Sequence, residues 1–90
     1  MIKIMDAVYS SSFTIHCEFS DGFCGEYDVK PLLVAKETPL TLPLREEQQF
    51  AAFFLRSGAI CWKNGLELDP QAIYLELKSQ GKLTRLSMAA

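Results

Sequence analysis

The hydrophobic and polar positions alternate most clearly between residues 13 and 29. Apolar side chains fall there mainly on odd positions and polar ones mainly on even positions. This period of two is typical of half-buried β-strands. The Asp21–Gly22 pair interrupts the pattern and predicts a hairpin turn. A further strand is predicted over residues 2–9, which are rich in apolar and β-branched side chains, so the first third of the chain predicts a β-meander.

The register of the hairpin follows from the side chains that can share its buried face. A two-residue loop would bring Glu26 onto that face opposite Cys17, at a high desolvation cost. A three-residue loop pairs Cys17 with Gly25 and leaves the apolar side chains together on the buried face. We therefore predict that Cys17 is buried and that Cys24 lies on the opposite face with His16.

Downstream of the hairpin, the spacing of apolar residues becomes helical. A short helical turn is predicted over residues 31–36 and a longer helix over residues 46–57. In the longer helix Phe50, Phe53 and Phe54 would form one apolar stripe. Three phenylalanine rings are a large apolar surface for so short an element, so we expect this helix to be the main anchor of the sheet.

The last part of the domain combines a strand, a turn and a helix. Residues 59–62 are apolar without alternation, which indicates a strand covered on both faces. Asn64 and Gly65 then predict a tight turn of type I′. The final helix begins at the N-cap Asp69 and runs to about residue 80. The predicted fold class is α+β, with a small antiparallel β-sheet packed against two or three α-helices in a single compact domain.

Length and composition limit the chain to one ordinary globular unit. It has 90 residues and a formal net charge of −2, and 49% of its residues are hydrophobic. We assign residues 1–80 to the α+β domain and residues 81–90 to a C-terminal tail. The tail keeps three apolar side chains that would either dock on a partner or fray, namely Leu83, Leu86 and Met88.

The sequence shows neither a membrane-spanning stretch nor the features of a signal peptide. The longest uninterrupted apolar stretch runs from Ala51 to Leu55, far short of a membrane span. The first residues do not form the apolar core of a signal peptide. We therefore expect a cytoplasmic protein that does not associate with membranes.

Basic side chains are scattered along the chain. The densest stretch, residues 78–85, holds Lys78, Lys82 and Arg85 and no aromatic residue. Affinity for DNA and RNA comes mainly from neutralising phosphates with clustered cations. We therefore predict no direct binding to nucleic acid.

The cysteines and the single histidine do not form a convincing metal site. Cys17, Cys24 and Cys61 lack CxxC spacing, and a tetrahedral zinc site would need all three together with His16. His16 and Cys17 are neighbours on a predicted strand, so their side chains point to opposite faces. We predict free thiols and no metal or other cofactor.

His16 and Cys24 share the polar face of the hairpin and form the one candidate catalytic pair. A thiol beside an imidazole base is an arrangement used in nucleophilic catalysis. The competing interpretation is a surface histidine beside a strand thiol, with nothing to orient the ring. The sequence contains no phosphate-binding loop, dinucleotide fingerprint, metalloprotease motif or calcium loop. We predict that the protein is not an enzyme.

Several short motifs, taken in order, carry a resemblance to a known family. They are Phe19-Ser20-Asp21-Gly22, Gly25, Asp28 with Pro31-Leu32-Leu33, Pro39-Leu40, Pro43-Leu44-Arg45, Phe50, Ile60-Cys61-Trp62-Lys63-Asn64-Gly65, Leu68-Asp69-Pro70 and Tyr74. In this order and spacing the chain resembles the bacterial domain of unknown function 2442 over most of residues 2–77. It departs from the family pattern at Lys63, where proline is common, and at Glu46-Glu47, where an Asp-Pro helix start is common.

The resemblance implies a small α+β fold without an established enzymatic activity. Some relatives carry an added helix-turn-helix domain, which implies transcriptional regulation, and others look like partners of a second small protein in arrangements similar to toxin–antitoxin pairs. Our leading hypothesis is a non-enzymatic module that binds a protein partner or a second copy of itself. The alternative is a regulatory domain that binds a small ligand or assists transcription through a DNA-binding partner.

The candidate interface residues are the most distinctive cluster of the sequence and the apolar tail. They are Trp62, Asn64, Gly65, Leu83 and Leu86. The competing interpretation of the first three is a core tryptophan followed by a hairpin turn.

Overall fold

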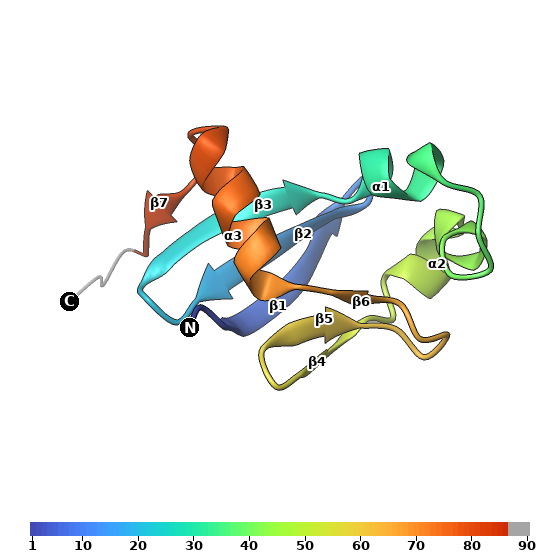
Figure 1. Cartoon of the computed structure of the whole chain (residues 1–90), viewed down its shortest axis with the longest axis horizontal. Helices are drawn as coiled ribbons and strands as arrows, with labels where there is room; N and C mark the ends of the chain where they lie inside the picture. Colours follow the sequence, from blue (N-terminus) through green and yellow to red (C-terminus); the bar gives the residue numbers. More distant parts are fainter. Residues whose placement is uncertain (87–90) are drawn as a thin grey trace.

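The computed structural model describes residues 1–86, in which two antiparallel sheets are combined with three α-helices and one 3₁₀ turn (Figure 1). The first sheet has the strand order β1-β2-β3-β7, with β1 at Ile4–Ser11, β2 at Thr14–Phe19, β3 at Phe23–Asp28 and β7 at Thr84–Arg85. The second has the order β4-β5-β6, with β4 at Phe54–Arg56, β5 at Ala59–Cys61 and β6 at Glu67–Leu68. The helices are α1 at Lys30–Ala35, α2 at Glu47–Phe50 and α3 at Pro70–Ser79, and the 3₁₀ turn η1 spans Leu42–Arg45. The predicted α+β class is confirmed.

The β2–β3 hairpin has the predicted register. Ile15 pairs with Tyr27 and Cys17 pairs with Gly25. Gly22 has a φ of +91°, which the bulged three-residue loop requires. Cys17 is fully buried, so the assignment of the odd-numbered side chains to the core face is confirmed.

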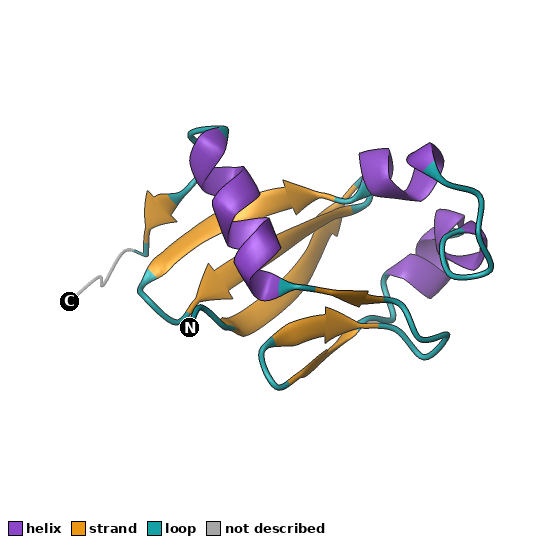
Figure 2. Ribbon diagram, viewed as in Figure 1, coloured by secondary structure: helices purple, strands orange, loops and turns teal. Residues whose placement is uncertain are grey.

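Helix α3 lies across one face of the first sheet (Figure 2). Asp69 caps the helix by accepting a hydrogen bond from the backbone N–H of Gln71, as its sequence predicts. Ile73 and Leu77 are buried against the sheet, whereas Leu75 is exposed. The close approach is possible because β3 carries no side chain at Gly25, where a Cβ atom would stand 3.1 Å from the Cδ1 atom of Leu77.

The predicted helix over residues 46–57 is wrong beyond its first turn. Helix α2 ends at Phe50, and strand β4 begins at Phe54. Ser57 and Gly58 both have positive φ, at 52° and 83°, and form a two-residue hairpin turn to β5. Pairing with the buried β5 satisfies the backbone of this segment, and such a tertiary contact overrides helical spacing.

Phe50 remains the aromatic centre of the core although the long helix is missing. Its ring is fully buried, and its centroid lies 5.2–6.4 Å from those of four neighbouring rings, which belong to Tyr9, Phe13, Phe53 and Trp62. Most of these pairs meet edge to face, the geometry that aromatic quadrupoles favour. One ring therefore supplies much of the anchoring that was predicted for three.

The C-terminal tail predicted from residue 81 is partly folded into the domain. Thr84 pairs with Cys24 and Arg85 with Phe23, which adds β7 to the edge of the first sheet. Leu83 is half-buried and packs against the core. The prediction for Met88 lies outside the described residues. No helix within residues 1–86 is long and apolar enough to cross a membrane.

Candidate functional site

The turn after β5 is fixed by the side chain of Asn64. Its amide Nδ2 donates to the backbone carbonyl of Leu40 at 2.9 Å, and its Oδ1 accepts from the N–H of Leu66 at 3.2 Å. Only Gly65 of the predicted Asn-Gly pair has a positive φ, and its N–H donates to the Trp62 carbonyl. The turn is therefore a three-residue loop with a bulge glycine, and the predicted type I′ turn is wrong.

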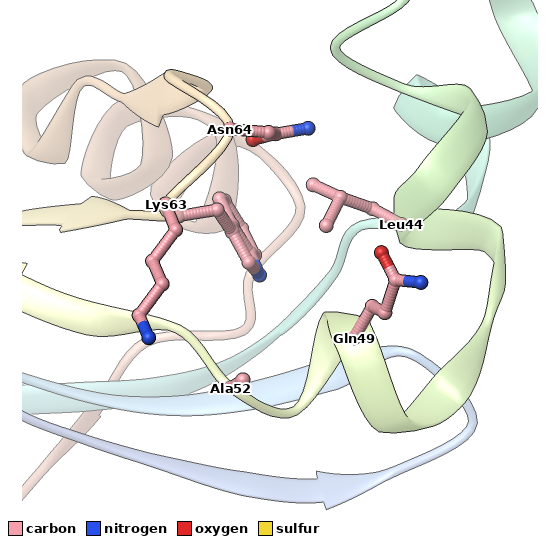
Figure 3. A pocket seen from close by; sticks show the side chains of 6 residues that line it. Leu44, Gln49, Ala52, Lys63 and Asn64 are labelled. Carbon is pink, nitrogen blue, oxygen red and sulfur yellow. The ribbon is translucent and has the colours of Figure 1, made fainter.

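Trp62 is buried beside this turn. Only 3% of its surface is exposed, and its indole Nε1 donates to the backbone carbonyl of Phe50 at 2.8 Å. The side chain forms part of the wall of a pocket of about 380 Å³, which we call the Trp62 pocket. Figure 3 shows Leu44 and Gln49 on one side of this pocket and Lys63 on the other. The core interpretation of Trp62 is thus correct, with one part of the ring lining a surface hollow.

A larger hollow lies on the other side of the Asn64–Leu40 contact. It measures about 570 Å³ and is lined by the end of β3, by α1, by the loop of residues 36–41, by Leu66 and by Glu76 of α3; we call it the α1–α3 groove. Most of its lining is apolar, from Tyr27, Pro31, Leu32, Ala35, Leu40 and Leu66. Its polar lining comes from Asp28, Lys36, Thr38, Thr41 and Glu76.

The loop that forms one wall of the groove is held by its own threonines. The hydroxyl of Thr41, a buried side chain, donates to the Lys36 carbonyl at 2.7 Å. The N–H of Thr38 donates to the same hydroxyl oxygen at 3.0 Å, and the Thr41 N–H donates to the Thr38 hydroxyl oxygen at 3.1 Å. These local bonds stabilise the conformation of residues 36–41, which form neither a helix nor a strand.

The charges at the groove are unevenly distributed. Asp28 and Glu76 bring two carboxylates to its lining, and Lys36 brings one ammonium group. The ion pairs found within residues 1–86 join only His16 to Glu18 and to Glu26, so these three groove side chains have no ion-pair partner there. Burial, together with the nearby Glu76 carboxylate, raises the pKa of Tyr27 to about 12. A tyrosine phenol is protonated at neutral pH in any case, and Tyr27 keeps its proton to a still higher pH.

The candidate pair His16 and Cys24 lies on one sheet face, as predicted, but the two side chains have other partners. His16 Nδ1 is hydrogen-bonded to the Glu26 carboxylate, and its Nε2 lies 3.5 Å from a Glu18 carboxylate oxygen. The Cys24 thiol lies 3.4 Å from the hydroxyl oxygen of Thr84. The nucleophile–base contact that a catalytic pair needs is thus not formed by these two residues.

The remaining thiols are shielded. Burial raises the pKa of Cys17 to about 12, and burial also raises the pKa of Cys61. Within residues 1–86 no group of three or more His, Cys, Asp or Glu side chains is arranged to hold a metal ion.

The structure divides the predicted interface residues into two groups. Trp62, Asn64 and Gly65 lie together at the boundary between the two hollows. Leu83 and Leu86 lie at β7 instead, where the half-buried Leu83 packs against the core and the N–H of Leu86 donates to the Gly22 carbonyl. The groove itself was missed, because its lining comes from separate segments and no local pattern links them.

The family model described as protein of unknown function (DUF2442) matches residues 4–79. The chain belongs to the DUF2442 family. The match begins at the first residue of β1 and ends at the last residue of α3, so it includes both hollows and leaves β7 outside. Neither the comparison with curated proteins nor the comparison with solved structures gives a match.

Proposed function

We propose that this DUF2442 protein is a non-enzymatic interaction module that binds another protein through the α1–α3 groove. The observation that carries the proposal is the groove itself, a mostly apolar hollow of about 570 Å³ on a chain of 90 residues. Apolar surface gathered in one place, with polar groups beside it, is typical of sites that a partner covers. The Trp62 pocket adjoins the groove across the Asn64–Leu40 contact and extends the same surface.

The family resemblance indicates which partner to try first. The first partner to test is a second small protein encoded next to this one, as in toxin–antitoxin pairs. The cytoplasm is the expected location. Direct nucleic-acid binding is not expected, because the net charge is −2 and the groove carries two carboxylates against one ammonium group.

The experiment is affinity purification of the full chain from the cells that make it, followed by size-exclusion chromatography. We expect a complex of fixed stoichiometry with the wild type. Ala35→Trp fills the groove at an exposed position of α1 and is expected to abolish the complex. Leu75→Trp, at an exposed position of α3 outside the groove lining, is the matched control and is expected to keep it. A wild-type chain that is strictly monomeric and retains no protein would contradict the proposal.

A second candidate function is the regulation of a partner by a small ligand. The volume of the groove favours it, because about 570 Å³ lies within the range of pockets that hold small molecules. Native mass spectrometry of the protein purified from its own cells distinguishes the two functions. An apolar metabolite bound to the wild type and lost in Ala35→Trp would favour the ligand, whereas a bound polypeptide would favour the interaction module.

A further inference from the structure

We propose that the α1–α3 groove receives a short segment of a partner protein that carries apolar side chains and one lysine or arginine. This inference rests on the proposed function and adds the chemistry of the occupant. The carrying observation is that the same hollow holds an apolar floor and two carboxylates, Asp28 and Glu76, that have no ion-pair partner within residues 1–86.

The apolar part of the segment is indicated by three leucines from separate parts of the fold. Leu32 comes from α1, Leu40 from the loop of residues 36–41 and Leu66 from the end of the turn after β5. Leu32 and Leu66 are half-buried, and 39% of Leu40 is exposed, so each retains apolar surface that a partner can cover. Side chains of complementary shape on one segment would cover all three at once.

The cationic part follows from the carboxylates. Asp28 stands at the end of β3 and Glu76 on α3, and both line the same hollow. One Asp28 oxygen accepts from the N–H of Lys30 at 3.0 Å, which fixes the side chain. The influence of the Glu76 charge reaches Tyr27 inside the groove, where it helps to raise the pKa of the phenol. A lysine or arginine placed on this side would face two negative charges, and an acidic residue there would be repelled.

The same charges disfavour a second copy of this chain as the occupant. A symmetric dimer built on the groove would place the groove of one subunit against the groove of the other. The interface would then hold four carboxylates, from the two copies of Asp28 and Glu76, against two Lys36 ammonium groups. Since Lys36 is the only basic residue in the lining, it leaves this surface poorly complementary to itself.

The wall of the groove is preorganised for such a segment. The hydrogen bonds between Thr38 and Thr41, and from Thr41 to the Lys36 carbonyl, hold the loop before anything binds. Binding therefore does not have to order this loop, and the unfavourable entropy of association is smaller. We expect the segment to bind with little change in the backbone of residues 36–41.

The test is selection of random peptides displayed on phage against the full wild-type chain. We expect the enriched peptides to combine apolar residues with lysine or arginine and to be depleted in aspartate and glutamate. A synthetic copy of one such peptide, measured by fluorescence polarisation, should lose at least about tenfold in affinity on Glu76→Lys. Exchanging the basic residue of the peptide for glutamate should restore binding to the Glu76→Lys variant. Ala35→Trp should abolish binding, and Leu75→Trp should leave it unchanged.

Three results would overturn the inference: no enrichment, enrichment of acidic or purely apolar peptides, or equal binding to Ala35→Trp and the wild type. Circular dichroism spectra of each variant, compared with that of the wild type, would show that the fold is kept. Failure of this inference is distinguishable from failure of the proposed function. A cellular complex that Ala35→Trp abolishes, together with a failed peptide selection, would leave an interaction module whose partner has different chemistry.

Discussion

Replacing Trp62 with phenylalanine is the most direct test of how the core supports the site. The change removes the indole N–H that donates to the Phe50 carbonyl at 2.8 Å. Helix α2 has only four residues, so this carbonyl at its end has no further helical turn from which to accept a hydrogen bond. The smaller ring also loses contact with Phe53, whose centroid lies 6.2 Å from that of Trp62.

Loss of the hydrogen bond and loss of ring packing both destabilise the fold. An unsatisfied buried carbonyl costs about 1–3 kcal/mol. The smaller ring leaves unfilled space beside Phe50 and Leu44, which costs about 1 kcal/mol more. We expect Trp62→Phe to lower the free energy of unfolding by about 2–4 kcal/mol in all. For a chain of this length the melting temperature should fall by roughly 10–25 °C.

Urea and thermal unfolding followed by far-ultraviolet circular dichroism measure both quantities. Lys63→Ala, at the exposed neighbouring position, is the control and should change the free energy of unfolding by less than about 0.5 kcal/mol. An unfolding midpoint of Trp62→Phe equal to that of the wild type would refute the reasoning, since it would mean that the Phe50 carbonyl finds another donor.

Three further predictions concern a turn, a buried thiol and a helix cap. Gly58→Ala should destabilise the fold by more than Gly22→Ala. Both positions have a positive φ, but only at Gly58 would the new Cβ clash with a neighbour, since it would lie 2.6 Å from the Cβ of Lys3. Chemical denaturation of the two variants measures the difference. Burial favours the neutral form of the Cys17 thiol and raises its pKa to about 12. The stability that this burial contributes should be fully present below about pH 9 and be lost as the pH rises toward about 12. Across this range the free energy of unfolding should fall less steeply in Cys17→Ala than in the wild type. Asp69→Ala should cost about 1 kcal/mol through loss of the N-cap, and an unchanged urea midpoint would show that another group caps α3.

The hairpin shows why part of this fold is readable from the sequence. Its register depends on which face each side chain takes, and only one register keeps Glu26 away from Cys17. The Asp69 cap is local in the same sense, because the acceptor and the donor lie two residues apart. Such features depend on neighbours in the chain, which a pattern records.

The segment after α2 shows where the same reasoning fails. Phe50, Phe53 and Phe54 have helical spacing, and Ser57–Gly58 suits the end of a helix as well as a hairpin turn. The outcome depends on pairing with β5, which buries the strand that follows the turn. A local pattern contains no information about the stability of that pairing.

Only one part of the candidate site, the Trp62–Gly65 stretch, could be predicted from the sequence. The Trp62–Gly65 stretch stands out in the sequence, and the structure places it between the two hollows. The apolar lining of the groove does not stand out, because Tyr27, Leu32 and Leu66 come from different segments and have ordinary roles in each. Folding creates this surface by bringing residues distant in the chain together.

Strand β7 has a consequence for the solubility of the molecule. It covers Phe23 and Cys24 at the edge of β3, and it lies beyond residues 4–79 that the family model matches. A chain shortened to the matched region would present open amide and carbonyl groups along that edge. Unprotected edges of this kind allow neighbouring molecules to pair with the sheet, so we expect the shortened chain to aggregate more readily than the full chain.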